Sequence, residues 1–312
     1  MVACSFLPAA TRMIYDMGLQ DRLHGITFEC PPDALAEKSK VVRCVLEGKH
    51  YSSEEIDRIF SASKAQGKSL YFVDDELLQH LSPDVIFTQD VCEVCQIDTA
   101  CTSAAVAKLA KQPQLVPLTP AGLDDVFASA VTIATALGAE EKAYAHLAAL
   151  QQRVDAIIDR LRETRAKPRR VMLMEWMAPI YNCGHWIPDQ IAMAGGVDML
   201  SNPKGDSVVT PWQKIVRYDP EVLVIAPCGF RVERSREELH LLTTHPEWKS
   251  LQAVRNNQAY IVDFELFTQP SASTLVDGIE VLAALFNPSL FAVPERLTNK
   301  VIKVKDRPAV IL

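Results

Sequence analysis

Short apolar runs alternate with longer amphipathic segments through the first 117 residues. The apolar runs are too short for buried helices and are bounded by proline, glycine or acidic residues, which is typical of strands in a buried sheet. The segments between them repeat apolar residues at helical spacing. We predict strands at 2–7, 25–29, 68–73, 85–89 and 114–117 and helices at 9–17, 53–66, 74–80 and 103–110. This alternation predicts a mostly parallel sheet with helices on its faces.

The middle of the chain has a different pattern. From Leu123 to about Arg165 nearly every residue favours a helix, with one break at Gly138. Within 140–165 the apolar residues form one stripe: Ala143, Leu147, Leu150, Val154, Ile157, Ile158 and Leu161. A helix of this length extends about 39 Å at roughly 1.5 Å per residue. We therefore expect a long connecting helix that ends at Lys167-Pro168.

The second half returns to the first pattern. We predict strands at 170–175, 222–226 and 259–262 and helices at 188–194, 211–216, 234–243 and 273–285. The stretch 81–89 also resembles 218–226, because in each a proline and an acidic residue precede a buried strand. The sequence therefore predicts an α/β protein of two Rossmann-like lobes, with a ligand cleft between them. The expected boundaries are 1–122 and 168–286 for the lobes, 123–167 for the connecting helices (the long one at about 140–165), and 287–312 for a polar tail.

Composition and charge narrow the functional classes. Apolar residues make up 48% and charged residues 23% of the 312 residues, which is ordinary for a globular protein. A net charge of −7 argues against a nucleic-acid partner. The longest uncharged run in the first half, 126–139, is too short for a transmembrane segment. Because the chain begins without a secretory signal, we expect either a cytoplasmic protein or a mature or trimmed chain of a periplasmic one.

Sequence motifs for nucleotide binding or hydrolysis are absent. The chain contains no Gly-x-Gly-x-x-Gly, no phosphate-binding Walker loop, no Gly-x-Ser-x-Gly and no His-Glu-x-x-His. Its 12 glycines also leave few places for a phosphate-binding loop. We therefore expect a binding protein without a required cofactor, and an enzyme that uses the same cleft is the weakest alternative.

The residues that follow the predicted strands combine aromatic, thiol and polar side chains. In open α/β sheets ligands bind at the carboxyl ends of the strands, and a few polar groups among aromatics suit a medium or large ligand with an apolar face. The alternative is that these aromatics only cap the core. The candidate ligand-binding residues are Leu7, Pro8, Glu29, Cys30, Arg43, Gln89, Glu175, Trp176, His185, Trp186, Cys228, Gly229, Phe230 and Phe264.

Several segments together resemble one known family. The opening Ser5-Phe6-Leu7-Pro8-Ala9-Ala10-Thr11, the later Leu23-His24-Gly25-Ile26-Thr27, the Leu-x-Pro-Asp-strand segment at 81–86 and the Gly-Gly-Val turn at 195–197 have the order and spacing of that family. The chain resembles the vitamin B12-binding substrate-binding proteins of ABC transporters over about residues 2–285. It is also similar to a cobalamin-binding-like branch that carries Phe-Glu-Cys-Pro-Pro, Thr-Gln-x-x-Cys-x-x-Cys and Pro-Cys-Gly-Phe.

The resemblance implies both a fold and a ligand class. It implies two α/β lobes joined by one long helix, a cobalamin, haem or siderophore chelate in the cleft, and an ABC permease as partner. Aromatic and apolar groups would then cover a corrinoid macrocycle, while Glu29, Arg43, Gln89 and Glu175 would orient its polar periphery. The polar tail at 287–312 lies outside the resemblance.

The cysteines and one histidine allow a second interpretation. Cys92 and Cys95 have the spacing of a metal knuckle or a redox pair, and thiolates there would suit zinc or an iron–sulfur cluster. An intracellular metal-binding or redox protein that reuses the fold is therefore the main alternative. His185 lies between Gly184 and Trp186, where its imidazole could be an axial ligand to cobalt or iron or an ordinary surface hydrogen-bonding group. We assign Cys4, Cys44 and Cys101 to packing.

Overall fold

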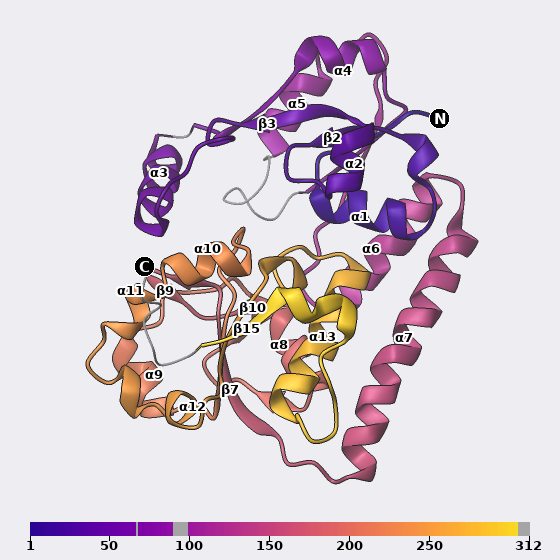
Figure 1. Cartoon of the computed structure of the whole chain (residues 1–312). Helices are drawn as coiled ribbons and strands as arrows, with labels where there is room; N and C mark the ends of the chain where they lie inside the picture. The colour runs from indigo at the N-terminus through magenta and orange to yellow at the C-terminus, as the bar shows by residue number, and fades with distance from the viewer. Residues whose placement is uncertain (67, 90–98, 305–312) are drawn as a thin grey trace. The chain divides into compact units, whose positions relative to one another are not determined.

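The computed structural model describes residues 1–66, 68–89 and 99–304, and the chain divides into two compact units. The first unit comprises 1–120, 124–149 and 271–273, and the second comprises 121–123, 150–270 and the residues from 274 onward. Helix α7 (Glu140–Glu163) is continuous (Figure 1), and its first ten residues cluster with the first unit and the others with the second. Each unit contains a largely parallel sheet with helices, so the α/β class expected from the sequence is confirmed.

The first unit contains a six-stranded sheet in the order β4-β3-β2-β1-β5-β6. All neighbours are parallel except β3 and β4. The central strands are buried along their whole length, as continuous apolar runs require in a parallel sheet. The strands are β1 (Ala3–Ser5), β2 (Leu23–Thr27), β3 (Ser39–Cys44), β4 (Tyr71–Val73), β5 (Val85–Thr88) and β6 (Gln114–Pro117).

Helices pack against strands β1 to β4 of this sheet. Helix α1 contacts β1 and β2, α4 contacts β2 and β3, and α5 contacts β4. One core cluster joins the strand residues Cys4, Val41 and Ile86 to Leu78 of α4 and Ala105 of α5. The helices are α1 (Pro8–Asp16), η1 (Gln20–Arg22), α2 (Pro32–Glu37), α3 (Ser53–Ala65), α4 (Asp75–Leu81), α5 (Thr99–Val106) and α6 (Leu123–Ala136).

The second unit contains a five-stranded sheet in the order β11-β7-β13-β14-β15, in which only β15 is antiparallel to its neighbour. Two short pairs, β8 with β9 and β10 with β12, extend beyond the end of β7. The strands are β7 (Arg169–Met174), β8 (Trp176–Met177), β9 (Ile180–Tyr181), β10 (Gly184–His185), β11 (Gly196–Val197), β12 (Asn202–Pro203), β13 (Val222–Ile225), β14 (Ala259–Val262) and β15 (Val301–Lys303).

The helices of the second unit are mostly short. Met172, Leu223 and Ile261 of the sheet pack with Trp212 of α9 and Trp248 of η2 in one core cluster. No helix among the described residues is long and apolar enough to cross a membrane. The helices are α8 (Ile187–Met193), α9 (Trp212–Tyr218), α10 (Val232–Glu237), α11 (His240–Thr243), η2 (Trp248–Ser250), α12 (Gln252–Arg255), η3 (Phe264–Leu266), α13 (Ala272–Phe286) and η4 (Glu295–Lys300).

The internal repeat noted in the sequence has the same local structure in both units. Ser82 and Asp219 each end a helix in the left-handed conformation. The acidic residue two positions later then accepts a backbone hydrogen bond from the neighbouring strand: Asp84 from Val2 N at 2.6 Å, and Glu221 from Arg170 N at 2.8 Å. The pair β1/β5 therefore corresponds to the pair β7/β13, residue for residue.

Four features differ from the sequence-based expectation. Strand β3 and helix α2 were not predicted, because β3 carries exposed Lys40 and half-exposed Arg43 and lacks a continuous apolar run. The helix expected at 234–243 is two helices, since the bonds from Leu241 N to Glu238 O and from Leu242 N to Leu239 O tighten its middle. The expected polar tail contributes β15 and packs Leu297 into the core.

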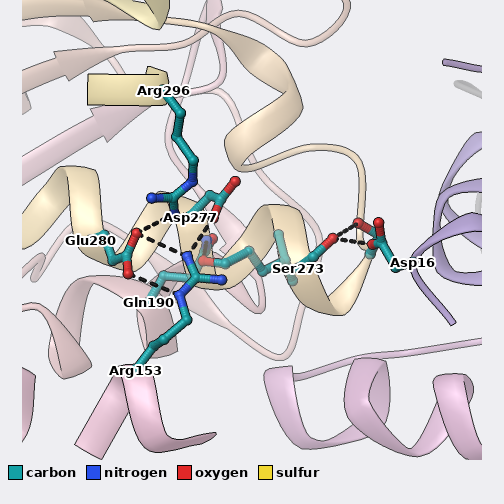
Figure 2. A network of polar contacts seen from close by, with 9 residues as sticks. Asp16, Arg153, Gln190, Ser273, Asp277, Glu280 and Arg296 are labelled. Atoms are coloured by element: carbon teal, nitrogen blue, oxygen red, sulfur yellow. Dashed lines mark hydrogen bonds and ion pairs between the residues drawn. The ribbon is translucent and has the colours of Figure 1, made fainter. Parts of the chain in front are cut away.

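Two arginines share two carboxylates of α13 in the second unit. Figure 2 shows Arg153 of α7 and Arg296 of η4 on either side of Asp277 and Glu280. Arg153 Nε donates to Glu280 Oε1 at 2.9 Å, and Arg296 donates to Asp277 Oδ1 at 2.8 Å. Burial opposes ionisation, yet the hydrogen bonds from both arginines hold the pKa of Glu280 below its usual range. The network therefore ties α7 and η4 to α13.

We expect Glu280→Gln to lower the free energy of unfolding of the second unit by about 1–2 kcal/mol at pH 7, because two arginines lose a charged acceptor. Since the pKa of Glu280 is lower in the folded state, its stabilisation is complete above the ordinary value of 4.5 and is lost as the pH falls through the folded-state value. The difference between variant and wild type should therefore shrink below about pH 4.

Urea unfolding followed by tryptophan fluorescence measures this change, because all four tryptophans (176, 186, 212 and 248) lie in the second unit. Glu163→Gln on α7 is the control, since the Glu163 side chain is exposed and an exposed pair contributes less than about 0.5 kcal/mol. Equal stability of the two variants at pH 7 would contradict the prediction.

Candidate functional site

The first sheet reverses its winding between β1 and β5. The connection that leaves β1 leads through α1 to β2 on one side, and the connection that leaves β5 leads to β6 on the other. Ligands of open α/β sheets bind outside the carboxyl ends of the strands at such a switch point. The predicted residues Leu7, Pro8 and Gln89 directly follow these two strands, and Glu29 and Cys30 follow the adjacent β2.

Leu7 and Pro8 begin helix α1 at this switch point. Leu7 is buried and extended, and its side chain offers no polar cap to the helix. Pro8 occupies the first helical position, where its missing N–H costs nothing. The Ser5 hydroxyl donates to Leu7 O at 2.8 Å and fixes this bend. The result is an apolar helix entrance beside the end of β5.

Glu29 and Cys30, which follow β2, differ in solvent exposure. Cys30 is 3% exposed, its thiol donates to Thr11 Oγ1 at 3.1 Å, and burial raises its pKa to about 12. Glu29 is exposed, and no donor among the described residues pairs with its carboxylate. Desolvation by the surrounding protein raises the pKa of Glu29 to about 7, so its carboxylate carries its full charge above neutral pH. Cys30 is therefore a protonated thiol, whereas Glu29 is available to a ligand.

Arg43 lies within β3 rather than after a strand. Its Nε donates to Glu47 Oε2 at 2.6 Å, and Lys40 contacts the same carboxylate. Its positive charge is therefore already paired within the first unit.

The second sheet has an equivalent switch point between β7 and β13. The chain leaves β7 for β11 on one side and leaves β13 for β14 on the other. Cys228 N donates to Glu175 O at 2.9 Å, and Phe264 N donates to Phe230 O at 3.2 Å. The strand ends of β7, β13 and β14 are therefore joined by backbone hydrogen bonds, which bring together the predicted residues Glu175, Trp176, Cys228, Gly229, Phe230 and Phe264.

An aromatic pair lies at this second switch point. The rings of Trp176 and Phe230 are 5.2 Å apart, and the guanidinium of Arg234 lies 4.7 Å from the Phe230 ring centre. Phe230 is buried while Trp176 keeps part of its surface exposed, and Trp176 Nε1 is satisfied by Ala178 O at 3.1 Å. Because Trp176 is partly exposed and its indole N–H is already bonded, it can present apolar surface to a ligand.

The segment 183–186 is held by hydrogen bonds on every side. Gly184 N donates to Glu175 Oε1 at 2.9 Å, His185 N donates to Gly205 O at 2.7 Å, and Trp186 Nε1 donates to Phe267 O at 2.6 Å. A side chain at position 184 would approach Gly205 O to 2.3 Å, so the two backbones touch. Glu175 is therefore a structural support for this segment within the second unit.

At the carboxyl ends of the strands in the two sheets, positive and negative side chains differ in how far they are free to bind a ligand. Arg231 pairs with Glu265 and Arg234 pairs with Glu238 near the ends of the second sheet's strands, and Arg43 within β3 pairs with Glu47. Burial raises the pKa of Asp263, which accepts from Glu265 N at 3.1 Å. Within the described part of the chain, Glu29 is thus a carboxylate without a cation, whereas these arginines are neutralised.

The proposed metal ligands Cys92 and Cys95 lie outside the described residues. Among the residues that are described, no group of three or more histidine, cysteine, aspartate or glutamate side chains is arranged to hold a metal ion. Cys4 and Cys44 are buried, in line with packing roles. Burial also raises the pKa of Cys183 well above its usual range, so this thiol is protonated.

Sequence reasoning missed two polar neighbours of the site. Asp206 contacts His185 Nε2 at 3.2 Å, and Asp198 accepts from Leu173 N at 3.0 Å beside Cys183. Asp206 lies in an Asn-Pro-Lys-Gly-Asp turn that gives no signal of its partner 21 positions earlier. Both contacts depend on how the loop 198–206 folds back, which local pattern does not encode.

A family model described as Periplasmic binding protein matches residues 8–266, well over half of the chain. The chain belongs to the periplasmic binding protein family. Substrate binding of the ABC-transporter type, rather than catalysis, is the activity of this family, with a small-molecule ligand and a permease partner. No curated protein matches the chain.

Solved structures of periplasmic binding proteins share this fold at low sequence identity. A periplasmic heme binding protein from Pseudomonas aeruginosa has a TM-score of 0.70 at 16% identity over 98% of this chain and 99% of that one. The vitamin B12 binding protein BtuF of Vibrio cholerae has a TM-score of 0.62 at 17% identity over 92% and 97%. An ABC-type Fe3+-hydroxamate transport protein from Saccharomonospora viridis has a TM-score of 0.63 at 17% identity over 91% of this chain and 92% of that one.

We expect Gly184→Ala to destabilise the second unit of this periplasmic binding protein by about 1–3 kcal/mol, because the new methyl group meets backbone atoms that have no room to move. Hydrogen exchange at His185 and Lys204 should become faster, since both amides bond across this contact. Gly122→Ala is the control, because its methyl group would meet flexible ends of Lys204 and Asp189. Exchange at both amides as slow as in Gly122→Ala would contradict the expected contact.

Proposed function

We propose that this chain is a substrate-binding protein that captures a cobalamin or related corrinoid for an ABC permease. The proposal rests first on the family, whose members are substrate-binding proteins. Solved structures with this fold include proteins titled as binding vitamin B12, heme or a hydroxamate chelate. The choice among these ligand classes has to come from this chain's own residues.

The availability of charge at the strand ends favours a corrinoid over haem. Haem carries propionates, which need free cations, whereas the periphery of a corrinoid carries neutral amides. The strand-end Arg231 and Arg234, and Arg43 within β3, are paired with carboxylates, and Glu29 remains open among the described residues. A carboxylate accepts hydrogen bonds from amide NH₂ groups and repels propionates. This imbalance is the observation that carries the proposal.

The remaining predicted residues fit the same ligand. The partly exposed Trp176, paired with Phe230, can cover part of a macrocycle, whereas Leu7 and Pro8 are buried and can only support the start of α1. Gln89 follows β5 and Gly229 exposes its backbone after β13, so both positions can serve amide groups.

Native mass spectrometry and calorimetry with cyanocobalamin, hemin and a ferric hydroxamate test the proposal. We expect a one-to-one complex with cyanocobalamin and weaker binding of the other two. Trp176→Ala should weaken the binding of cyanocobalamin by about 1–2 kcal/mol, roughly 5- to 30-fold in Kd, because the contact with the indole ring is lost. Tyr144→Ala, on the exposed face of α7, is the control and should leave binding unchanged. Preference for hemin would overturn the corrinoid assignment.

The charge argument has its own test in Glu29→Gln. The glutamine amide still exchanges hydrogen bonds with corrinoid amides, so the Kd for cyanocobalamin should stay within about 2-fold. Removing the negative charge should strengthen hemin binding by about 3- to 10-fold, which corresponds to roughly 0.6–1.4 kcal/mol of Coulomb repulsion. Asp21→Asn, an equal charge change at an exposed position of the first unit, is the control. If both variants change hemin binding equally, Glu29 does not select the ligand.

A second candidate function is metal handling through Cys92 and Cys95. The observation that favours it is their place in the sequence, shortly after β5 ends at the first switch point. Thiolates in a Cys-x-x-Cys pair bind zinc, copper(I) or iron–sulfur clusters. The same mass measurement separates the two functions, because a metal increment without corrinoid binding, lost in the double serine variant, would favour this candidate.

A further inference from the structure

His185 has an unusual backbone for its position. Its φ is +51°, in the left-handed region. Four of the other five non-glycine residues with positive φ among those described (Ser82, Arg165, Asp219 and Asn257) follow the end of a helix, where this conformation is a common cap. His185 instead precedes helix α8. A sparsely populated conformation that is not explained by a cap is held by its surroundings and is often found at functional sites.

The surroundings hold this histidine firmly. Its N–H donates to Gly205 O at 2.7 Å and its carbonyl accepts from Lys204 N at 3.0 Å. The preceding residue is tied to Glu175, and the ring of the following Trp186 lies 5.3 Å from the imidazole. Because Glu175 directly follows β7 and precedes Trp176, the imidazole lies in the strand-end region of the second unit.

The imidazole itself is polarised by a carboxylate. His185 Nε2 lies 3.2 Å from Asp206 Oδ1, while the structure gives no hydrogen bond to Nδ1 from any residue in 1–66, 68–89 or 99–304. The histidine side chain is 23% exposed and that of Asp206 is 85% exposed. A carboxylate this close to Nε2 favours the tautomer that carries its proton there, which leaves the lone pair on Nδ1. Carboxylate–histidine pairs of this kind support metal-ligating histidines.

We propose that Nδ1 of His185 is an axial ligand to the metal of the bound chelate, with Asp206 as its positioning residue. The inference rests on the proposed function, because the metal arrives with the ligand. In a cobalt(III) corrinoid with an axial water, the Nδ1 lone pair forms the Co–N bond and the water leaves with its own electron pair. The cobalt keeps its oxidation state, so no oxidant, reductant or proton acceptor is required. The chain therefore prefers corrinoids whose axial position exchanges.

Aquocobalamin and cyanocobalamin test this step, because water is displaced readily and cyanide is not. We expect the wild-type protein to shift the visible absorption bands of aquocobalamin on binding and to leave those of cyanocobalamin nearly unchanged. His185→Gln should abolish the shift and raise the Kd for aquocobalamin by about 10-fold or more. The Kd for cyanocobalamin should change by less than about 3-fold. His240→Gln, an exposed histidine of the same unit, is the matched control and should behave as wild type.

Asp206→Ala separates positioning from ligation. We expect its complex with aquocobalamin to keep the shifted bands with about 3-fold weaker binding, at the low end of what an orienting partner contributes because Asp206 is exposed. Binding of aquocobalamin without a band shift, or an equal shift in His185→Gln, would overturn the axial role while leaving corrinoid capture intact. Absence of binding by either corrinoid would overturn the proposed function, and the axial role with it.

Discussion

The central parallel strand pair of each sheet is the constraint on which the candidate site depends. A parallel pair buried on both faces has no turn to set its register, and here a carboxylate does so. Asp84 accepts Val2 N, and Glu221 accepts Arg170 N, at the start of β1 and β7. Fixing the amino ends of these pairs also fixes which residues leave together at the carboxyl ends. The Pro-acid dipeptide at the amino ends of each strand pair therefore determines which residues meet at the switch point at the other end.

The same constraint explains how much the sequence could predict. Strands such as 85–88 and 222–225 are continuous apolar runs after Pro-acid, so their position and their ends are visible in the sequence. The strands β3 and β15 cannot be recognised in the sequence in this way. They contain polar residues and are strands because they pair with a neighbouring strand. Candidate residues after the central strands could therefore be named, whereas Arg43, inside β3, lies within a strand and beside Glu47.

Contacts made by irregular loops were beyond sequence reasoning for a related reason. The stretch 198–206 has no periodicity, yet it supplies Asp198 to Leu173 N and Asp206 to His185. Its path is set by close backbone approach, in which Gly184 faces Gly205 and Asn182 bonds both Leu200 O and Val208 N. Such contacts follow from the three-dimensional course of two backbones, so the residue types alone carry no record of them.

Pairing of charges gives the strand-end regions their chemical character. A guanidinium that is already paired with a carboxylate gains little by binding an anionic ligand, because that binding would leave the carboxylate without its partner. Arg234 is bound in this way to Glu238 while its planar face lies over Phe230, so it stiffens an aromatic surface rather than offering charge. Glu29, by contrast, has kept its hydrogen-bonding capacity. Under the proposed function, paired cations and an open carboxylate would favour neutral, amide-bearing ligands by excluding anionic ones as much as by attraction.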